Sequence, residues 1–200
     1  KAIIITYLYG IVPNLQRIIK VCKKNNLFII EDFSHNLNSQ FKSKNLGTFG
    51  DVGVYSSSSI KTLDTFGGGL AITDDNNIYE YFNEVIKNFK TPPRIIVIKK
   101  IIINLVRNFA TNRILFFLFT FPIIKILKKI YPDDILKYSG TRDISPVKSL
   151  EPEIFYAYTS FQAKVGLTLL KSVLKKDKIR INNVNYMKSQ LKNIDFPEGD

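Results

Sequence analysis

The sequence predicts an α/β protein with a mixed, mostly parallel β-sheet. Two apolar, β-branched runs at residues 2–8 and 27–30 lack polar alternation, as is usual for strands that are buried on both faces. Between them, residues 14–24 have the periodicity of a helix. A strand, a helix and a strand within about 30 residues form a βαβ unit, so we expect two parallel strands with a right-handed crossover.

The elements that follow complete this α/β section. Asn14 is a suitable N-cap for the first helix. Short apolar runs at residues 52–55 and 70–73 predict two more strands. After the second of these strands, Thr73 or Asp74 is expected to cap another helix.

The second half of the chain predicts helices only. Residues 94–130 have the pattern of two basic, very apolar helices with residues 108–112 between them. A loop is expected at about 131–152, followed by helices near 154–175 and 178–193.

Charge is concentrated in one part of the chain. The 29 basic and 17 acidic residues give a net charge of +12. Ten basic residues and no acidic residue lie between Glu84 and Asp133, so the rest of the chain is nearly neutral. This distribution excludes a protein that is basic throughout, such as a histone-like DNA binder. One cysteine and one histidine exclude a disulfide framework and leave few ligands for zinc.

Polar residues follow two of the predicted strands at their carboxyl ends, where open α/β sheets bind ligands. Asp32 follows the second strand, and His35 comes three residues later. Ser56 follows the third strand, Lys61 comes five residues later, and glycines 67–69 precede the fourth. Hydroxyl and backbone N–H groups after a strand suit a phosphate. Each feature alone is explained by an ordinary cap or solvated loop, but the ordered set is more specific.

This ordered set resembles the DegT/StrS-type sugar aminotransferases, the pyridoxal-phosphate enzymes that aminate keto-sugars on nucleotide carriers. The resemblance covers residues 1–90 and about 157–190. It implies a PLP-dependent transferase of fold type I (aspartate aminotransferase-like), with part of the large domain, a helical insertion and the start of the small domain. The matching segments are Tyr7–Gly10 (with tyrosine in place of the family's usual histidine), Ile30–Asp32, Gly47–Asp51, Tyr55–Lys61, Gly68–Asp74 and Thr159–Leu167.

The resemblance implies roles for four residues. Lys61 looks like the catalytic lysine, which forms a Schiff base with the cofactor aldehyde and moves a proton as a general base. Asp32 would pair with the pyridinium nitrogen of the cofactor. His35 would lie beside the ring hydroxyl, and Ser56 would help to hold the phosphate. The sugar dehydratase relatives have histidine in place of this lysine, so Lys61 favours transamination.

The function implied by the resemblance is transfer of an amino group to a keto-sugar nucleotide, in polysaccharide and amino-sugar biosynthesis. Pyridoxal 5'-phosphate is the expected cofactor, glutamate the expected amino donor and a homodimer the expected assembly, without a metal or nucleic acid. The alternative is a non-catalytic protein that binds a membrane surface or a polyanion on a decayed aminotransferase scaffold.

Residues 94–130 have two interpretations. In the first, they are a helical hairpin in a membrane interface, with basic residues at anionic headgroups. In the second, they are two helices packed in a core or a subunit interface, with snorkelling lysines. No run reaches the roughly 20 apolar residues that span a bilayer. The expected location is the cytoplasm, with peripheral contact at the inner face of the membrane left open.

We also expect the chain to be the middle of a longer protein, because it opens directly in a strand-like run and stops just after a helical pattern. Three domains are expected. Residues 1–92 are part of the cofactor-binding large domain, and residues 93–152 are the basic helical insertion and loop. Residues 153–200 are helices that lead into a truncated C-terminal small domain.

Overall fold

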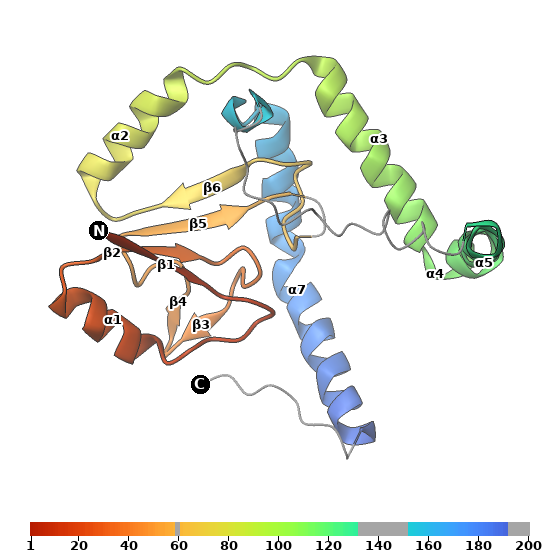
Figure 1. Ribbon diagram of the computed structural model, residues 1–200, viewed down its shortest axis with the longest axis horizontal. Coiled ribbons are helices and arrows are strands. Elements are labelled where there is room, and N and C mark those ends of the chain that lie inside the picture. The colour runs from red at the N-terminus through yellow and green to blue at the C-terminus, as the bar shows by residue number, and fades with distance from the viewer. Residues whose placement is uncertain (59–60, 132–151, 192–200) are drawn as a thin grey trace. The chain divides into compact units, whose positions relative to one another are not determined.

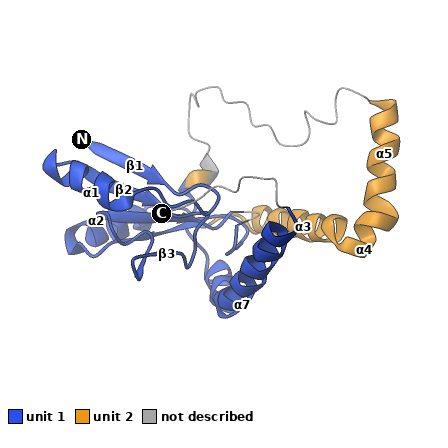
Figure 2. Ribbon diagram, turned by 90° about the horizontal axis from the view of Figure 1, so that it is seen from below, with its two compact units in different colours: residues 1–91, 155–200 blue, residues 92–154 orange. Residues whose placement is uncertain are grey.

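The computed structural model describes residues 1–58, 61–131 and 152–191 (Figure 1). The chain forms two compact units, one of residues 1–91 with 155–200 and the other of residues 92–154 (Figure 2). The expected division into three domains stays a prediction.

The first unit is built on a four-stranded sheet with the order β1-β2-β5-β6. Strand β1 (Ala2–Thr6) pairs in parallel with β2 (Phe28–Asp32), and β2 pairs in parallel with β5 (Val52–Ser56). Strand β6 (Gly69–Ile72) runs antiparallel to β5. The predicted mixed, mostly parallel sheet is therefore confirmed.

Helix α1 (Leu15–Lys24) connects β1 to β2 and completes the predicted βαβ unit. Asn14 caps it as predicted, because its side-chain oxygen accepts a hydrogen bond of 3.0 Å from the backbone N–H of Arg17. The buried side chains of Leu15 and Cys22 join the main apolar core of the unit. Burial of this face, more than helix propensity, stabilises a helix of this length.

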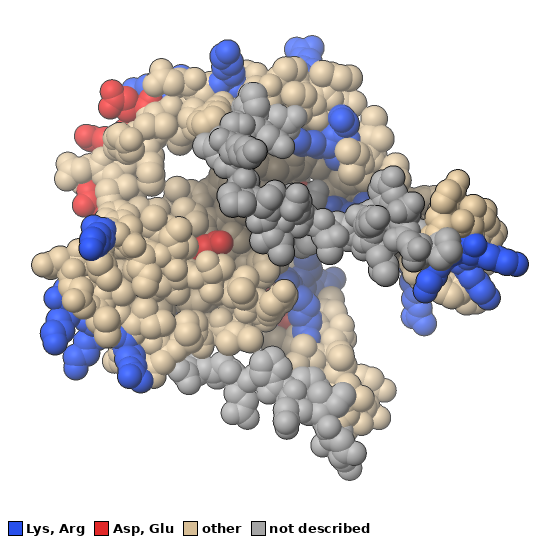
Figure 3. All heavy atoms as spheres, viewed as in Figure 1, with Lys and Arg blue, Asp and Glu red and all other residues tan. Residues whose placement is uncertain are grey.

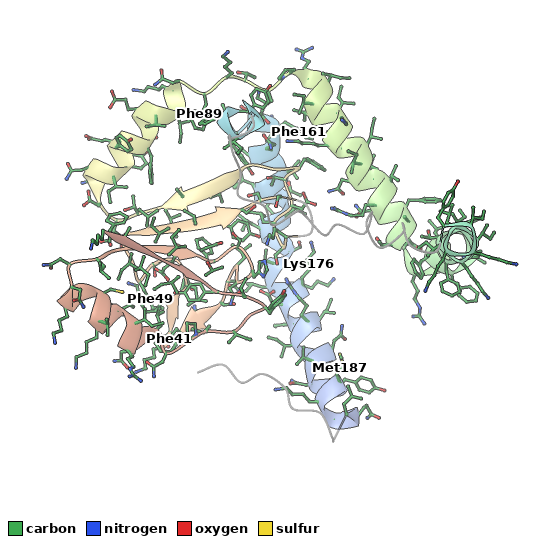
Figure 4. All side chains as sticks on the ribbon, in the orientation of Figure 1. Phe41, Phe49, Phe89, Phe161, Lys176 and Met187 are labelled. Atoms are coloured by element: carbon green, nitrogen blue, oxygen red, sulfur yellow. The ribbon has the colours of Figure 1, made fainter. Side chains whose placement is uncertain are left out.

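Two very short strands, β3 (Gln40–Phe41) and β4 (Lys44–Asn45), form a small antiparallel hairpin between β2 and β5. The ring of Phe41 packs edge-on against that of Phe49 at 6.0 Å between centroids, and both are labelled in Figure 4. This contact ties the hairpin to the loop that leads into β5.

A buried carboxylate fixes that loop. Glu31 is fully buried and accepts a hydrogen bond of 2.6 Å from the hydroxyl of Tyr7. Its two oxygens also accept the backbone N–H groups of Gly47, Phe49 and Gly50, at 3.0, 2.6 and 2.5 Å. Burial, together with the hydrogen bond to Glu31, raises the pKa of Tyr7. These hydrogen bonds replace those that the Glu31 side chain would make with water, and so offset the cost of burying it.

Helix α2 (Asn76–Lys87) follows β6. Its N-cap is Asp75, whose Oδ1 accepts two backbone N–H groups of the first turn at 2.8 and 3.2 Å. The prediction of Thr73 or Asp74 as the cap is therefore wrong by one or two residues. The hydroxyl of Thr73 accepts the N–H of Asp75 instead, at 3.2 Å, which places it outside the helix.

The end of the chain contains a 3-10 turn (Pro152–Phe155) and one long helix, α7 (Ser160–Gln190). The prediction of two helices near 154–175 and 178–193 is wrong. Residues 174–180 contain neither glycine nor proline, so nothing there interrupts the backbone ladder.

The second unit confirms two basic, apolar helical stretches, which meet at Asn112. The break is this single residue and not the predicted 108–112, because α3 continues to Thr111. No single helix in the described ranges is long and apolar enough to cross a membrane, although the two stretches pass that test together and are bent by 67°. The elements are α3 (Arg94–Thr111), α4 (Arg113–Leu115), a π-helical turn η1 (Phe116–Thr120) and α5 (Phe121–Ile130).

Candidate active site

The carboxyl ends of the three parallel strands lie side by side. The register aligns Thr6 of β1 with Asp32 of β2, and Asp32 with Val54 of β5. Asp32 and Ser56 are the last residues of their strands. The fold therefore brings the polar residues that follow β2 and β5 to one edge of the sheet.

Ser34 connects these two strand ends. Its backbone N–H and its hydroxyl both donate to Oδ1 of Asp32, at 3.0 and 2.5 Å. The same hydroxyl accepts the backbone N–H of Ser56 at 2.9 Å. Within the described residues, the hydrogen bonds to the Asp32 carboxylate all end on Oδ1. The second oxygen, Oδ2, has no hydrogen-bond partner within the described residues.

His35 and Lys61 line one pocket of about 230 Å³, together with Tyr9, Ser34, Thr62 and Arg180. Nδ1 of His35 accepts the backbone N–H of Tyr9 at 3.4 Å, and the two rings meet edge to face at 5.8 Å. The structure therefore places two of the four predicted site residues around one cavity. Asp32 and Ser56 are linked to it through Ser34 and do not line it.

The serine segment after β5 differs in one respect from expectation. The backbone N–H groups of Ser56 and Ser57 are not free, because they donate to Ser34 Oγ and to the carbonyl of Gly68, both at 2.9 Å. The hydroxyls of Ser56 and Ser58 lie 3.0 Å apart, so one donates to the other and the pair keeps one hydroxyl hydrogen for a ligand. The hydroxyl of Ser57 is fully buried and has no partner among the described residues.

The start of α7 holds the loop that follows Lys61. The side-chain amide of Gln162 donates to the carbonyls of Thr65 and Gly67, both at 3.1 Å. The hydroxyl of Tyr158 donates to Thr65 Oγ1 at 2.7 Å. Gly68 has φ +82°, and a Cβ there would lie 2.6 Å from the ring of Tyr158, so only glycine fits without rearrangement. Phe161, labelled in Figure 4, stacks on Phe66 of the same loop.

Further along α7, a second group of contacts reaches the residue next to Lys61. Nη1 of Arg180 donates to the hydroxyl of Thr62 at 3.0 Å, and Nη2 forms an ion pair of 2.7 Å with Asp177. Lys176, also labelled in Figure 4, lies on the same helix. It lines an open hollow of about 390 Å³ with Lys61 and Arg180, so the surroundings of Lys61 are positively charged.

Sequence reasoning missed three residues that position this site. Gln162 was named only as part of a matching segment, and neither Ser34 nor Arg180 was singled out. Ser34 stands between two residues that were named, so its place beside Asp32 was a usable signal. The bonds of Gln162 and Arg180 join residues about 100 positions apart, and no local pattern encodes them.

The residues present fit pyridoxal phosphate. This group needs an amine for its aldehyde, an acid for its ring nitrogen and donors for its phosphate. The pocket offers the amine of Lys61, Asp32 keeps one carboxylate oxygen free, and the hydroxyls of Ser56 and Ser58 lie next to each other.

The fold is of type I, as in two solved structures to which this chain is similar. A DegT/DnrJ/EryC1/StrS aminotransferase from Brucella abortus superposes with a TM-score of 0.60 over 100% of this chain and 41% of its own, at 19% sequence identity. An Escherichia coli GDP-4-keto-6-deoxy-D-mannose-3-dehydratase with bound hydrated PLP has a TM-score of 0.59 over 100% of this chain and 43% of its own, also at 19% identity.

The family match of this chain lies in its first half. Residues 1–91 match the model of the DegT/DnrJ/EryC1/StrS aminotransferase family. A GDP-perosamine synthase of Escherichia coli O157:H7 is 39% identical over 80 residues, which are 40% of this chain and 22% of that protein. A UDP-4-amino-4,6-dideoxy-N-acetyl-beta-L-altrosamine transaminase of Helicobacter pylori is 34% identical over 80 residues, 40% of this chain and 21% of that protein. The chain thus spans about a fifth of the length of these curated relatives.

Proposed function

We propose that the protein is a PLP-dependent aminotransferase that transfers an amino group to a keto-sugar nucleotide, with Lys61 as its catalytic lysine. The observation that carries this proposal is the common pocket of Lys61 and His35 at the sheet edge where Asp32 ends β2. The family match over residues 1–91 and the relatives named as sugar-nucleotide aminotransferases support it.

When bound, pyridoxal phosphate supplies an aldehyde that bonds to amines and a ring that stabilises negative charge on the neighbouring carbon. Lys61 would provide the amine that bonds to the aldehyde and the base that moves the proton. The Thr62–Arg180 hydrogen bond would restrict the backbone next to this amine.

Asp32 would accept the ring N–H through Oδ2, while Ser34 holds the other oxygen and so fixes the carboxylate plane. Because Nδ1 of His35 accepts the N–H of Tyr9, the neutral imidazole carries its proton on Nε2 and can donate to the cofactor. Ser56 would donate its hydroxyl hydrogen to the phosphate and accept the hydroxyl hydrogen of Ser58.

The finer parts of the proposal rest on the family resemblance. They are glutamate as the amino donor, a homodimeric assembly and a cytoplasmic location. The non-catalytic alternative is not favoured, because the matching proteins are named as aminotransferases and related sugar enzymes. Contact of residues 94–130 with a membrane does not depend on this activity and rests on separate observations.

The test is cofactor uptake by the full chain. We expect the purified protein to become yellow with added pyridoxal phosphate and to show the visible absorption of a lysine-bound cofactor. Lys61→Ala should remove this band, whereas Lys164→Ala, which changes an exposed lysine on α7, should keep it. A folded protein that stays colourless with excess cofactor, or a band that survives Lys61→Ala, would refute the proposal.

A further inference from the structure

Helix α3 has its apolar side exposed and a polar side chain buried. The one buried residue within α3 is Asn104, which is 8% exposed. Residues spaced by three and four positions along the opposite side are between 49% and 70% exposed. This apolar stripe consists of Ile95, Ile98, Ile102, Leu105 and Phe109.

The second helical stretch, from α4 to α5, continues the exposed apolar surface. Eight large apolar side chains there are more than half exposed: Ile114, Phe117, Leu118, Phe119, Phe121, Ile123, Ile126 and Ile130. Soluble monomers rarely expose contiguous apolar patches of more than a few hundred Å². An exposed apolar surface of this kind is typical of a site that binds a partner or a membrane.

The charge of the same segment indicates which partner. Residues 94–130 contain eight basic residues and no acidic residue. In α5, helical spacing places Lys125, Lys128 and Lys129 on the side opposite to Ile123, Ile126 and Ile130. Basic side chains and no acidic ones are visible around α5 at the right of Figure 3. A basic polar side opposite an apolar one is typical of helices that lie in an anionic lipid interface.

We propose that residues 94–130 bind the surface of an anionic phospholipid bilayer, with the apolar stripe and the apolar side of α5 in the acyl boundary. The basic side chains then meet the headgroups, and Lys99 and Lys100 in the middle of α3 reach them by extending their apolar stems. The bend of 67° at Asn112 fits two helices that lie in the interface one after the other, each too short and too charged to span alone.

A second copy of this chain fits the surface less well. Two such segments packed together would bring eight basic residues of each copy close to those of the other, with no acidic residue in either segment to pair with them. Anionic headgroups supply the missing negative charge. The proposal is independent of the aminotransferase activity, because none of the site residues lies in 94–130.

The first experiment measures co-sedimentation of the full chain with vesicles, made of phosphatidylcholine alone or mixed with phosphatidylglycerol. We expect strong binding only to the anionic vesicles, and weaker binding as salt shortens the Debye length below about 10 Å. The triple change Lys125→Gln, Lys128→Gln and Lys129→Gln should weaken binding on the order of a hundredfold, at about fivefold for each basic residue.

The second experiment tests the apolar contribution. Ile102→Glu with Phe109→Glu should reduce binding at least tenfold, because both side chains would have to be buried. Both are exposed in the free protein, so the fold should survive, which circular dichroism checks. The matched control, Tyr79→Glu with Tyr81→Glu, changes two equally exposed apolar residues of α2 and should leave binding unchanged.

Two results would overturn the proposal. One is equal sedimentation of the native chain and the Ile102→Glu, Phe109→Glu variant. The other is evidence that the apolar stripe joins two copies of the chain. In that case light scattering shows a lipid-free dimer, and the same variant converts it to a monomer while vesicle binding stays unchanged.

Discussion

Gln162 is the residue through which α7 holds the loop after Lys61, so Gln162→Met should loosen that loop. Methionine has a similar length but cannot donate, so the carbonyls of Thr65 and Gly67 lose a buried donor at 3.1 Å each. The change also removes the side-chain half of the capping box, in which Oε1 of Gln162 accepts the backbone N–H of Thr159 at 3.0 Å. Three hydrogen bonds of about 1 kcal/mol each give a loss of about 3 kcal/mol in unfolding free energy.

Urea unfolding of the full chain, followed by circular dichroism, measures this loss, which lowers the folding equilibrium constant by about two orders of magnitude. Hydrogen exchange provides a local readout, because the amides of Thr65 and Gly67 donate to the carbonyl of Ser57 at 3.1 and 3.2 Å and should exchange faster in the variant. The matched control is Gln190→Met at the exposed end of the same helix, which should change stability by less than about 0.5 kcal/mol. If Gln162→Met costs no more than Gln190→Met, α7 does not hold this loop.

Two further predictions concern stability. Gly68→Ala should lower the unfolding free energy by at least about 2 kcal/mol, because its φ of +82° is combined with a Cβ position 2.6 Å from Tyr158. The control Gly10→Ala, at φ +87° in open space, should lower it by only about 1 kcal/mol. Equal losses of the two variants in urea unfolding would contradict this. Tyr7→Phe removes the hydrogen bond to buried Glu31 and should cost about 2 kcal/mol near neutral pH. Because the pKa of Tyr7 is raised in the folded state, its stabilising effect is complete below the ordinary tyrosine pKa of 10.0 and falls as pH rises above it. The difference between the native chain and Tyr7→Phe should therefore shrink above pH 10.0, and a constant difference would show that Tyr7 ionises as it does in the unfolded chain.

The elements of the sheet could be predicted because their signals are local. The apolar runs of β1 and β2 and the side chain of Asn14 each act within a few residues, so their pattern is visible along the chain. The helix boundaries were less secure. A choice among Thr73, Asp74 and Asp75 depends on which side chain faces the first turn, and all three residue types are suitable caps.

The site was predictable in part, for a physical reason. Lys61 and His35 were named because they follow strands whose ends must share an edge of a parallel sheet. Contacts made by α7 could not be predicted, since the hydrogen bond from Gln162 to Thr65 joins residues 97 positions apart. The long helix α7 was predicted as two helices, although the charged residues at 175–178 are compatible with a helix interior.

The central claim is that the amine of residue 61 is the group that binds the cofactor. Borohydride treatment of the full chain loaded with pyridoxal phosphate, followed by peptide mass mapping, tests it most directly. The account predicts that the cofactor mass is found on the peptide that contains Lys61 and disappears in Lys61→Ala. A label found on Lys176 or on another lysine, with Lys61 unmodified, would contradict it.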